Sequence, residues 1–105
     1  MQMNSKNLVN YSSDEFNNLS QFQQEEITNN FKEAILYKMK EKNLHIDEVS
    51  EKAGYSSRDL SALLYSDTVS YETHAELQRI LAVVNSFAYS EEKEKTTPIE
   101  SFFYD

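Results

Sequence analysis

The sequence predicts a small all-α domain of four to five helices. Two observations support this class: apolar residues recur at intervals of three and four along residues 25–85, and no stretch alternates convincingly as a sheet strand does. Helices joined by short loops without a sheet form an all-α domain. We expect this domain to span 25–89, between a polar leader over 1–24 and an acidic, aromatic tail over 90–105.

The leader is rich in asparagine, glutamine and serine and lacks a long apolar period. Phe16, Leu19 and Phe22 nevertheless fall three residues apart. That spacing is compatible with a short helix that docks on the domain.

The first long helix is expected over 25–42. Its apolar face is formed by residues spaced as on one side of a helix, namely Ile27, Phe31, Ala34, Ile35 and Met39. Asn43 is a plausible stop for this helix.

A short second helix is expected over 46–53, with Asp47 and Glu48 in the first turn, where the helix dipole favours negative charge. Its buried face would come from Leu44, Val49 and Ala53. Gly54, the only glycine of the chain, follows directly. A glycine there adopts the left-handed conformation without a Cβ penalty, so we expect it to end the helix.

Two further helices follow, each after a serine that can cap its backbone N–H groups. Ser56 begins the third, over 56–65, and Ser70 begins the fourth, which continues to about Asn85. Their expected inward residues are Leu60, Leu63 and Leu64 on the third helix, and Ala75, Leu77, Ile80, Leu81 and Val84 on the fourth.

Two short helices joined by a tight glycine-containing turn make a helix-turn-helix unit. The stretch LHIDEVSEKAGYSSRDLSALL, residues 44–64, resembles the helix-turn-helix of the XRE/Cro repressor family. The residues that carry the resemblance are Leu44, Val49, Ser50, Gly54, Tyr55, Ser56 and Leu60, with Leu77, Ile80 and Val84 downstream. His45 and Ile46 depart from it, because family members often have serine or threonine and then a phosphate-binding glutamine there.

The resemblance implies a repressor-like, sequence-specific DNA-binding regulator with the helix over 56–65 in the major groove. Candidate DNA-binding residues are Ser56, Ser57, Arg58, Ser61, Ala62, Tyr65 and Lys52, with Lys38 and Lys42 as further candidates for phosphate contacts. Arg58 is the strongest of them, because a guanidinium binds guanine or phosphate well. A core of roughly 60 residues is marginal alone, and we expect a homodimer on an inverted-repeat operator.

The net charge of −8 favours an alternative on the same fold. Tight non-specific DNA binding depends on cations, and an acidic surface is suited to a basic protein partner. The protein would then be an antirepressor or antitoxin that sequesters another protein, such as a toxin or a repressor, with weak or no DNA binding. The architecture is similar to that of small phage regulators and HigA-type antitoxins. Phe102, Phe103 and Tyr104 in the tail are candidate residues for docking a partner.

Several other classes are not expected. The chain has no cysteine, no signal-like start and no apolar run near the roughly 20 residues that span a bilayer, so we expect a soluble cytoplasmic protein. No phosphate loop, metal-ligand spacing or activated nucleophile is recognisable, so we expect no enzyme, no cofactor and no metal site. His45 is interpreted as a helix-start residue.

Overall fold

The computed structural model describes residues 8–87 and consists there of helices only, which confirms the all-α class. The helices are α1 (Ser13–Asn17), α2 (Gln21–Glu41), α3 (Ile46–Ala53), α4 (Ser57–Tyr65) and α5 (Tyr71–Asn85). Within this part of the chain, no helix is long and apolar enough to cross a membrane. The candidate docking residues Phe102, Phe103 and Tyr104 lie outside it.

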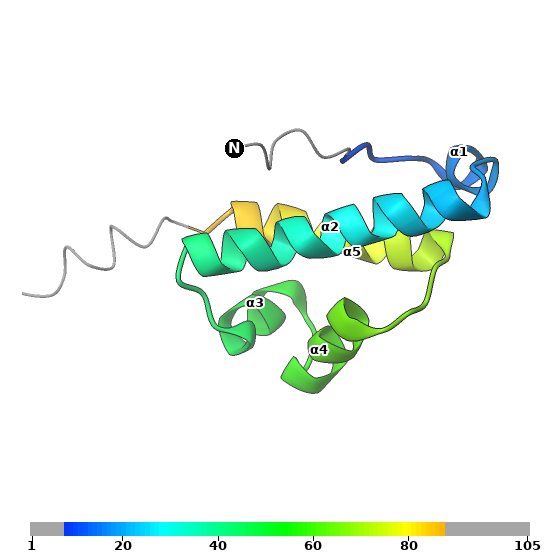
Figure 1. The fold of residues 1–105 in the computed structure, drawn as a ribbon. Coiled ribbons are helices and arrows are strands. Elements are labelled where there is room, and N and C mark those ends of the chain that lie inside the picture. The colour runs from blue at the N-terminus through cyan, green and yellow to red at the C-terminus, as the bar shows by residue number, and fades with distance from the viewer. Residues whose placement is uncertain (1–7, 88–105) are drawn as a thin grey trace, which may run out of the picture.

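The long helices α2 and α5 lie side by side and form the most extensive contact of the fold (Figure 1). Helix α1 packs at one end of this pair, and α3 and α4 lie together on one side of it. The core is continuous from α1 to α5 and contains Phe16, Ile27, Phe31, Ile35, Met39, Leu44, Val49, Ala53, Leu60, Leu64, Leu77, Ile80 and Val84. The residues that the helical periods predicted to be buried supply most of this core.

The expected ranges of the last three helices agree with the structure to within one residue, but α2 begins at Gln21 rather than at residue 25. The reason is a capping box. The Ser20 hydroxyl accepts from the Gln23 N–H at 3.1 Å, and the Gln23 side chain accepts from the Ser20 N–H at 3.0 Å. This cap allows the polar residues from Gln21 onward to form the first turn of α2. Of the three leader residues expected to dock, Phe16 is buried, but Phe22 lies on α2 and is 73% exposed, so the expectation for Phe22 was wrong.

The segment before α1 is attached to α5 through its backbone. The Tyr11 N–H donates to His74 Nε2 at 3.1 Å, and Gln78 Nε2 donates to the Tyr11 carbonyl at 3.4 Å. His74 is fully buried and stacks on the Phe16 ring, with 5.0 Å between ring centroids. Its acceptor role at Nε2 requires a neutral imidazole with the proton on Nδ1. His74 is therefore a structural residue that holds the leader on the domain.

Lys42 is buried and caps the C-terminal end of α5. Its ammonium donates to the carbonyls of Val84, Asn85 and Phe87 at 3.0, 3.1 and 2.8 Å. Burial lowers the pKa of Lys42, and the charge of Lys38 lowers it further. The expectation that Lys42 contacts phosphate was therefore wrong, because its charge is used inside the fold to satisfy the last carbonyls of a helix.

Replacing Lys42 with methionine should destabilise the protein by roughly 2–3 kcal/mol, because the side chain keeps its length but leaves the three carbonyls without their charged donor. Urea unfolding measures the loss. The matched control is Lys40→Met, at an exposed position in the last turn of α2. This substitution should change the free energy of unfolding by less than about 0.5 kcal/mol. Equal effects of the two substitutions would contradict the capping role.

Acid should destabilise the protein through His74. Burial lowers the pKa of its imidazole below the ordinary value, so below about pH 6.5 the unfolded chain binds more protons than the folded one. The free energy of unfolding then decreases with falling pH, by at most about 1.4 kcal/mol per pH unit from this group, until the folded-state pKa is passed.

Urea unfolding at about pH 7.5 and about pH 5.5 measures this dependence. The variant His74→Gln keeps an acceptor for the Tyr11 N–H but does not titrate, so its stability should change less between the two conditions. An unchanged pH dependence in His74→Gln would show that other groups cause it.

Candidate functional site

Helices α3 and α4 are joined by a turn of three residues, Gly54–Ser56, whose geometry depends on Gly54. Gly54 has φ 84° and ψ 25°, the left-handed conformation that its position after α3 predicted. The next N–H, of Tyr55, donates back to the Ser50 carbonyl at 2.8 Å. Ser56 then caps α4, its hydroxyl accepting from the Asp59 N–H at 3.0 Å. The chain therefore leaves one helix and enters the next with the expected chemistry at each step.

Arg79 of α5 fixes this turn to the rest of the domain. Its guanidinium donates to the carbonyl of Ala53, the last residue of α3, at 2.7 Å and to Glu76 Oε1 at 3.3 Å. The same guanidinium lies 5.1 Å from the centroid of the Tyr55 ring, and the Tyr55 hydroxyl donates to the Glu76 carboxylate. Burial and this hydrogen bond to Glu76 raise the pKa of Tyr55. We call these three residues, Tyr55, Glu76 and Arg79, the turn anchor.

One side of α4 is buried and the opposite side is open. Leu60 and Leu64 point into the core and are 0% and 2% exposed. The residues on the open side are spaced as on one helical face, and we call them the outer face of α4: Arg58, Ser61, Ala62 and Tyr65. Ser61 is half-buried, Arg58 and Ala62 are exposed, and Tyr65 is 71% exposed. The structure thus brings four of the seven predicted site residues together on one surface.

The other three predicted residues make contacts within the domain. The Ser56 hydroxyl caps α4, and the Ser57 hydroxyl donates to the Asp47 carboxylate on α3. Lys52 is exposed on α3, with its Nζ 4.7 Å from the centroid of the Phe87 ring. Ser56 and Ser57 therefore both have structural roles. The sequence indicated the capping role of Ser56 but not the contact of Ser57 with α3.

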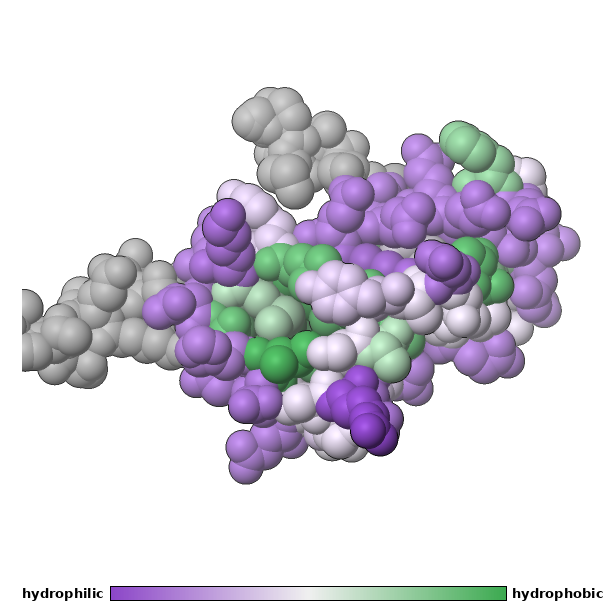
Figure 2. Space-filling model, turned by 60° about the horizontal axis from the view of Figure 1, so that its bottom comes forward, coloured by the Kyte–Doolittle hydropathy of each residue, from purple (hydrophilic) through white to green (hydrophobic). Residues whose placement is uncertain are grey.

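The surface around the outer face is acidic. Helices α3 and α4 carry two cations, Lys52 and Arg58, and four carboxylates, Asp47, Glu48, Glu51 and Asp59, for a net charge of −2. Figure 2, which brings this side of the molecule forward, shows hydrophobic side chains gathered at its centre with hydrophilic ones around them. Carboxylates therefore outnumber cations on the two helices of the candidate site.

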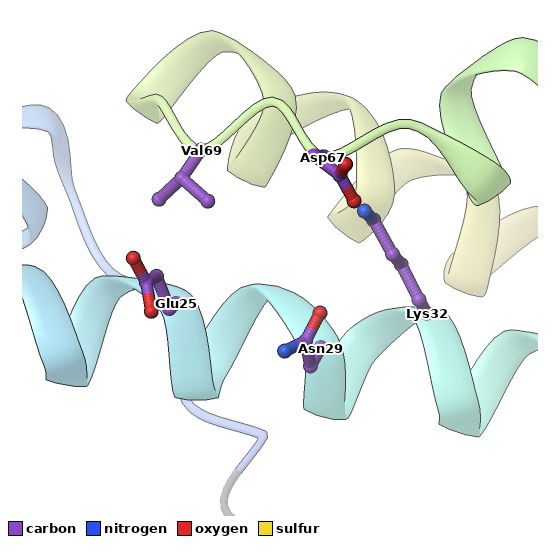
Figure 3. A pocket seen from close by; sticks show the side chains of 5 residues that line it. All are labelled: Glu25, Asn29, Lys32, Asp67 and Val69. Atoms are coloured by element: carbon purple, nitrogen blue, oxygen red, sulfur yellow. The ribbon is translucent and has the colours of Figure 1, made fainter.

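A concave feature lies between α2 and the loop that joins α4 to α5 (Figure 3). This cavity of about 220 Å³ is lined by Glu25, Asn29, Lys32, Asp67 and Val69. The ammonium of Lys32 is largely buried and donates to the Ser66 carbonyl, so Lys32 holds the loop against α2. Over residues 8–87 there is no group of three or more histidine, aspartate or glutamate side chains placed to hold a metal ion.

No family model, no curated protein and no solved structure matches this chain. The contacts that sequence reasoning missed are the turn anchor and the hydrogen bond between Ser57 and Asp47. The turn anchor joins the turn to α5, and the hydrogen bond joins α3 to α4, so neither contact can be recognised from the period of a single helix.

Gly54→Ala should destabilise the protein by about 1 kcal/mol, because a Cβ disfavours the left-handed conformation. A Cβ at this position would meet nothing within 4 Å, so backbone strain alone sets the loss. Gly54→Asn should be milder, since asparagine tolerates positive φ. Urea unfolding of both variants checks this order, and a loss far above that value in Gly54→Ala would mean that the turn has no space for a side chain.

Proposed function

We propose that this protein is a small DNA-binding regulator that inserts the outer face of α4 into the major groove. The observation that carries the proposal is the geometry of α3, the Gly54 turn and α4. Two short helices meet at a tight turn and lie on one side of the α2–α5 pair (Figure 1), and the second of them exposes Arg58, Ala62 and Tyr65. Two short helices joined in this way are typical of helix-turn-helix proteins, and the resemblance of residues 44–64 to the XRE/Cro family supports the proposal.

Each residue of the outer face has a plausible role against DNA. The Arg58 guanidinium can donate to both O6 and N7 of one guanine. The Ser61 hydroxyl can bind a base edge or a phosphate, and the Ala62 methyl can contact a thymine methyl. The Tyr65 hydroxyl can donate to a phosphate at the far end of the helix. Lys52 adds a candidate phosphate contact from α3.

One copy of α4 offers a single guanidinium and few other base contacts, which is too little to specify a site in a genome. We therefore include a homodimer in the proposal, with the two copies of α4 in successive major grooves. Two-fold symmetry would then require an inverted repeat with half-sites about one helical turn, roughly 34–36 Å, apart.

A second candidate function is the binding of a basic protein on the same surface. The observation that favours it is the net charge of −2 on α3 and α4, together with the exposed ring of Tyr65. Aromatic residues are common at protein interfaces, and carboxylates around them select a cationic partner. In that case the protein would act as an antirepressor or antitoxin, with DNA binding weak or lost.

Arg58→Ala should weaken binding to the preferred duplex by roughly 10- to 100-fold, the effect of losing one bidentate contact to guanine. Arg58→Lys is the matched control, because it keeps the charge but not the planar pair of donors. It should preserve affinity for random duplexes and lose only the preference. Fluorescence anisotropy over a range of salt concentrations, with DNA from upstream of the protein's own gene, measures both quantities.

The salt series also separates the two candidates. Lys52→Ala, which removes the candidate phosphate contact, should make the dependence of log K on log salt shallower by about 0.9 per copy, whereas Arg58→Ala should mainly reduce the base preference. If the wild-type protein binds no duplex even at about 50 mM salt and instead retains a basic partner on purification, the DNA-binding proposal is wrong and the second candidate is favoured.

A further inference from the structure

The start of α4 is tied to α3 by three polar groups that lie against one another. The Ser57 hydroxyl donates to the Asp47 carboxylate. The Ser50 hydroxyl lies 3.0 Å from the Asp47 carbonyl, to which it donates, and 3.2 Å from the Ser57 hydroxyl. Because a hydroxyl has one proton, Ser57 has none left to donate to another group while this contact persists.

This contact lies at the end of α4 that matters most for a helix in the major groove. Ser57 is the first residue of α4, and the N-terminal residues of a recognition helix are those that contact base edges. Ser57 is half-buried and bonded to α3, whereas the next residue, Arg58, is exposed. The chain therefore has a serine at a position suited to base contacts and occupies its hydroxyl internally.

Asp47 also places a negative charge beside the start of α4. It is exposed on the first turn of α3, one helix away from Arg58, and Asp59 adds a second carboxylate in the first turn of α4. A carboxylate that approaches a duplex repels phosphates, whose neutralisation by cations provides most of the affinity for DNA. Asp47 thus opposes DNA binding in two separable ways, through its charge and through its hold on Ser57.

We infer that Asp47 is a positioning residue that limits both the affinity and the base preference of this protein for DNA. The inference rests on the DNA-binding function proposed above. Its carboxylate keeps Ser57 turned toward α3, leaves base contacts to Arg58, Ser61 and Ala62, and lowers the attraction of phosphates. The same carboxylate stabilises α3, since negative charge in the first turn of a helix is favourable.

The charge effect is isolated by Asp47→Asn, because the amide oxygen can still accept from Ser57. This variant should bind both preferred and random duplexes about threefold more tightly at low salt, and the gain should disappear at high salt. The matched control is Asp14→Asn in the first turn of α1, which packs at the end of the α2–α5 pair away from α4 (Figure 1). It removes the same charge and should leave affinity nearly unchanged.

The hydroxyl effect is isolated by a cycle of Asp47→Ala, Ser57→Ala and the double variant. With Asp47 present, Ser57→Ala should leave the preference for base acceptors unchanged, because the single proton of the hydroxyl is already donated to Asp47. Asp47→Ala frees that hydroxyl and should alter the preference at one base-pair position by up to about tenfold. Adding Ser57→Ala to Asp47→Ala should remove the new preference. Selection from a randomised duplex library, followed by anisotropy, measures these changes.

The outcomes are distinguishable from those that test the proposed function. If the wild-type protein binds DNA through Arg58 but Asp47→Asn gains no more than Asp14→Asn, and Ser57→Ala alone changes the base preference, the inference about Asp47 is wrong and DNA binding stands. If no variant binds any duplex, both the proposed function and the inference are overturned. Thermal unfolding of each variant checks that the compared proteins are folded. If Asp47→Ala does not fold, Asp47→Asn alone decides the charge effect.

Discussion

The guanidinium of Arg79 links the turn before α4 to α5. This one group donates to the carbonyl that ends α3, lies over the ring of Tyr55 in the turn, and pairs with Glu76, which accepts the Tyr55 hydroxyl. A left-handed glycine allows the chain to reverse, but it does not fix the angle between the helices and the α2–α5 pair. The turn anchor attaches the turn to α5, and Leu60 and Leu64 bury the opposite side of α4 in the core, so the exposed face of α4 is not held by the turn alone.

The placement of positive charge has consequences for function. Within residues 8–87, Lys32, Lys42 and Arg79 each donate to backbone carbonyls at the ends of helices, those of Ser66, Val84 and Ala53 among them. The other cations of residues 8–87 are Lys38, Lys40, Lys52 and Arg58, in a protein whose net charge is −8. Any DNA binding must therefore rely on a small number of directed contacts rather than on a general attraction for phosphate, which favours a dimer and modest affinity.

Much of the helical pattern was predictable from the sequence, because capping serines, Gly54 and the apolar spacing are local signals. The start of α2 was not, since its first turn is polar and depends on the reciprocal cap between Ser20 and Gln23. The buried role of Lys42 and the attachment of Tyr11 to His74 were also missed. Each joins groups distant along the chain, and nothing in a single sequence marks such pairs. The outer face of α4 was predictable, but the inward bond of Ser57 was not.

We propose that the outer face of α4 is the surface that binds DNA. A titration of the ¹⁵N-labelled protein with a duplex from upstream of its gene, followed by amide chemical shifts in NMR spectra, tests it most directly. The largest changes in amide chemical shift should fall on Arg58, Ser61, Ala62 and Tyr65 and on the neighbouring turn. Changes confined to α2 around the exposed Phe22, or an unchanged spectrum at saturating duplex, would contradict it.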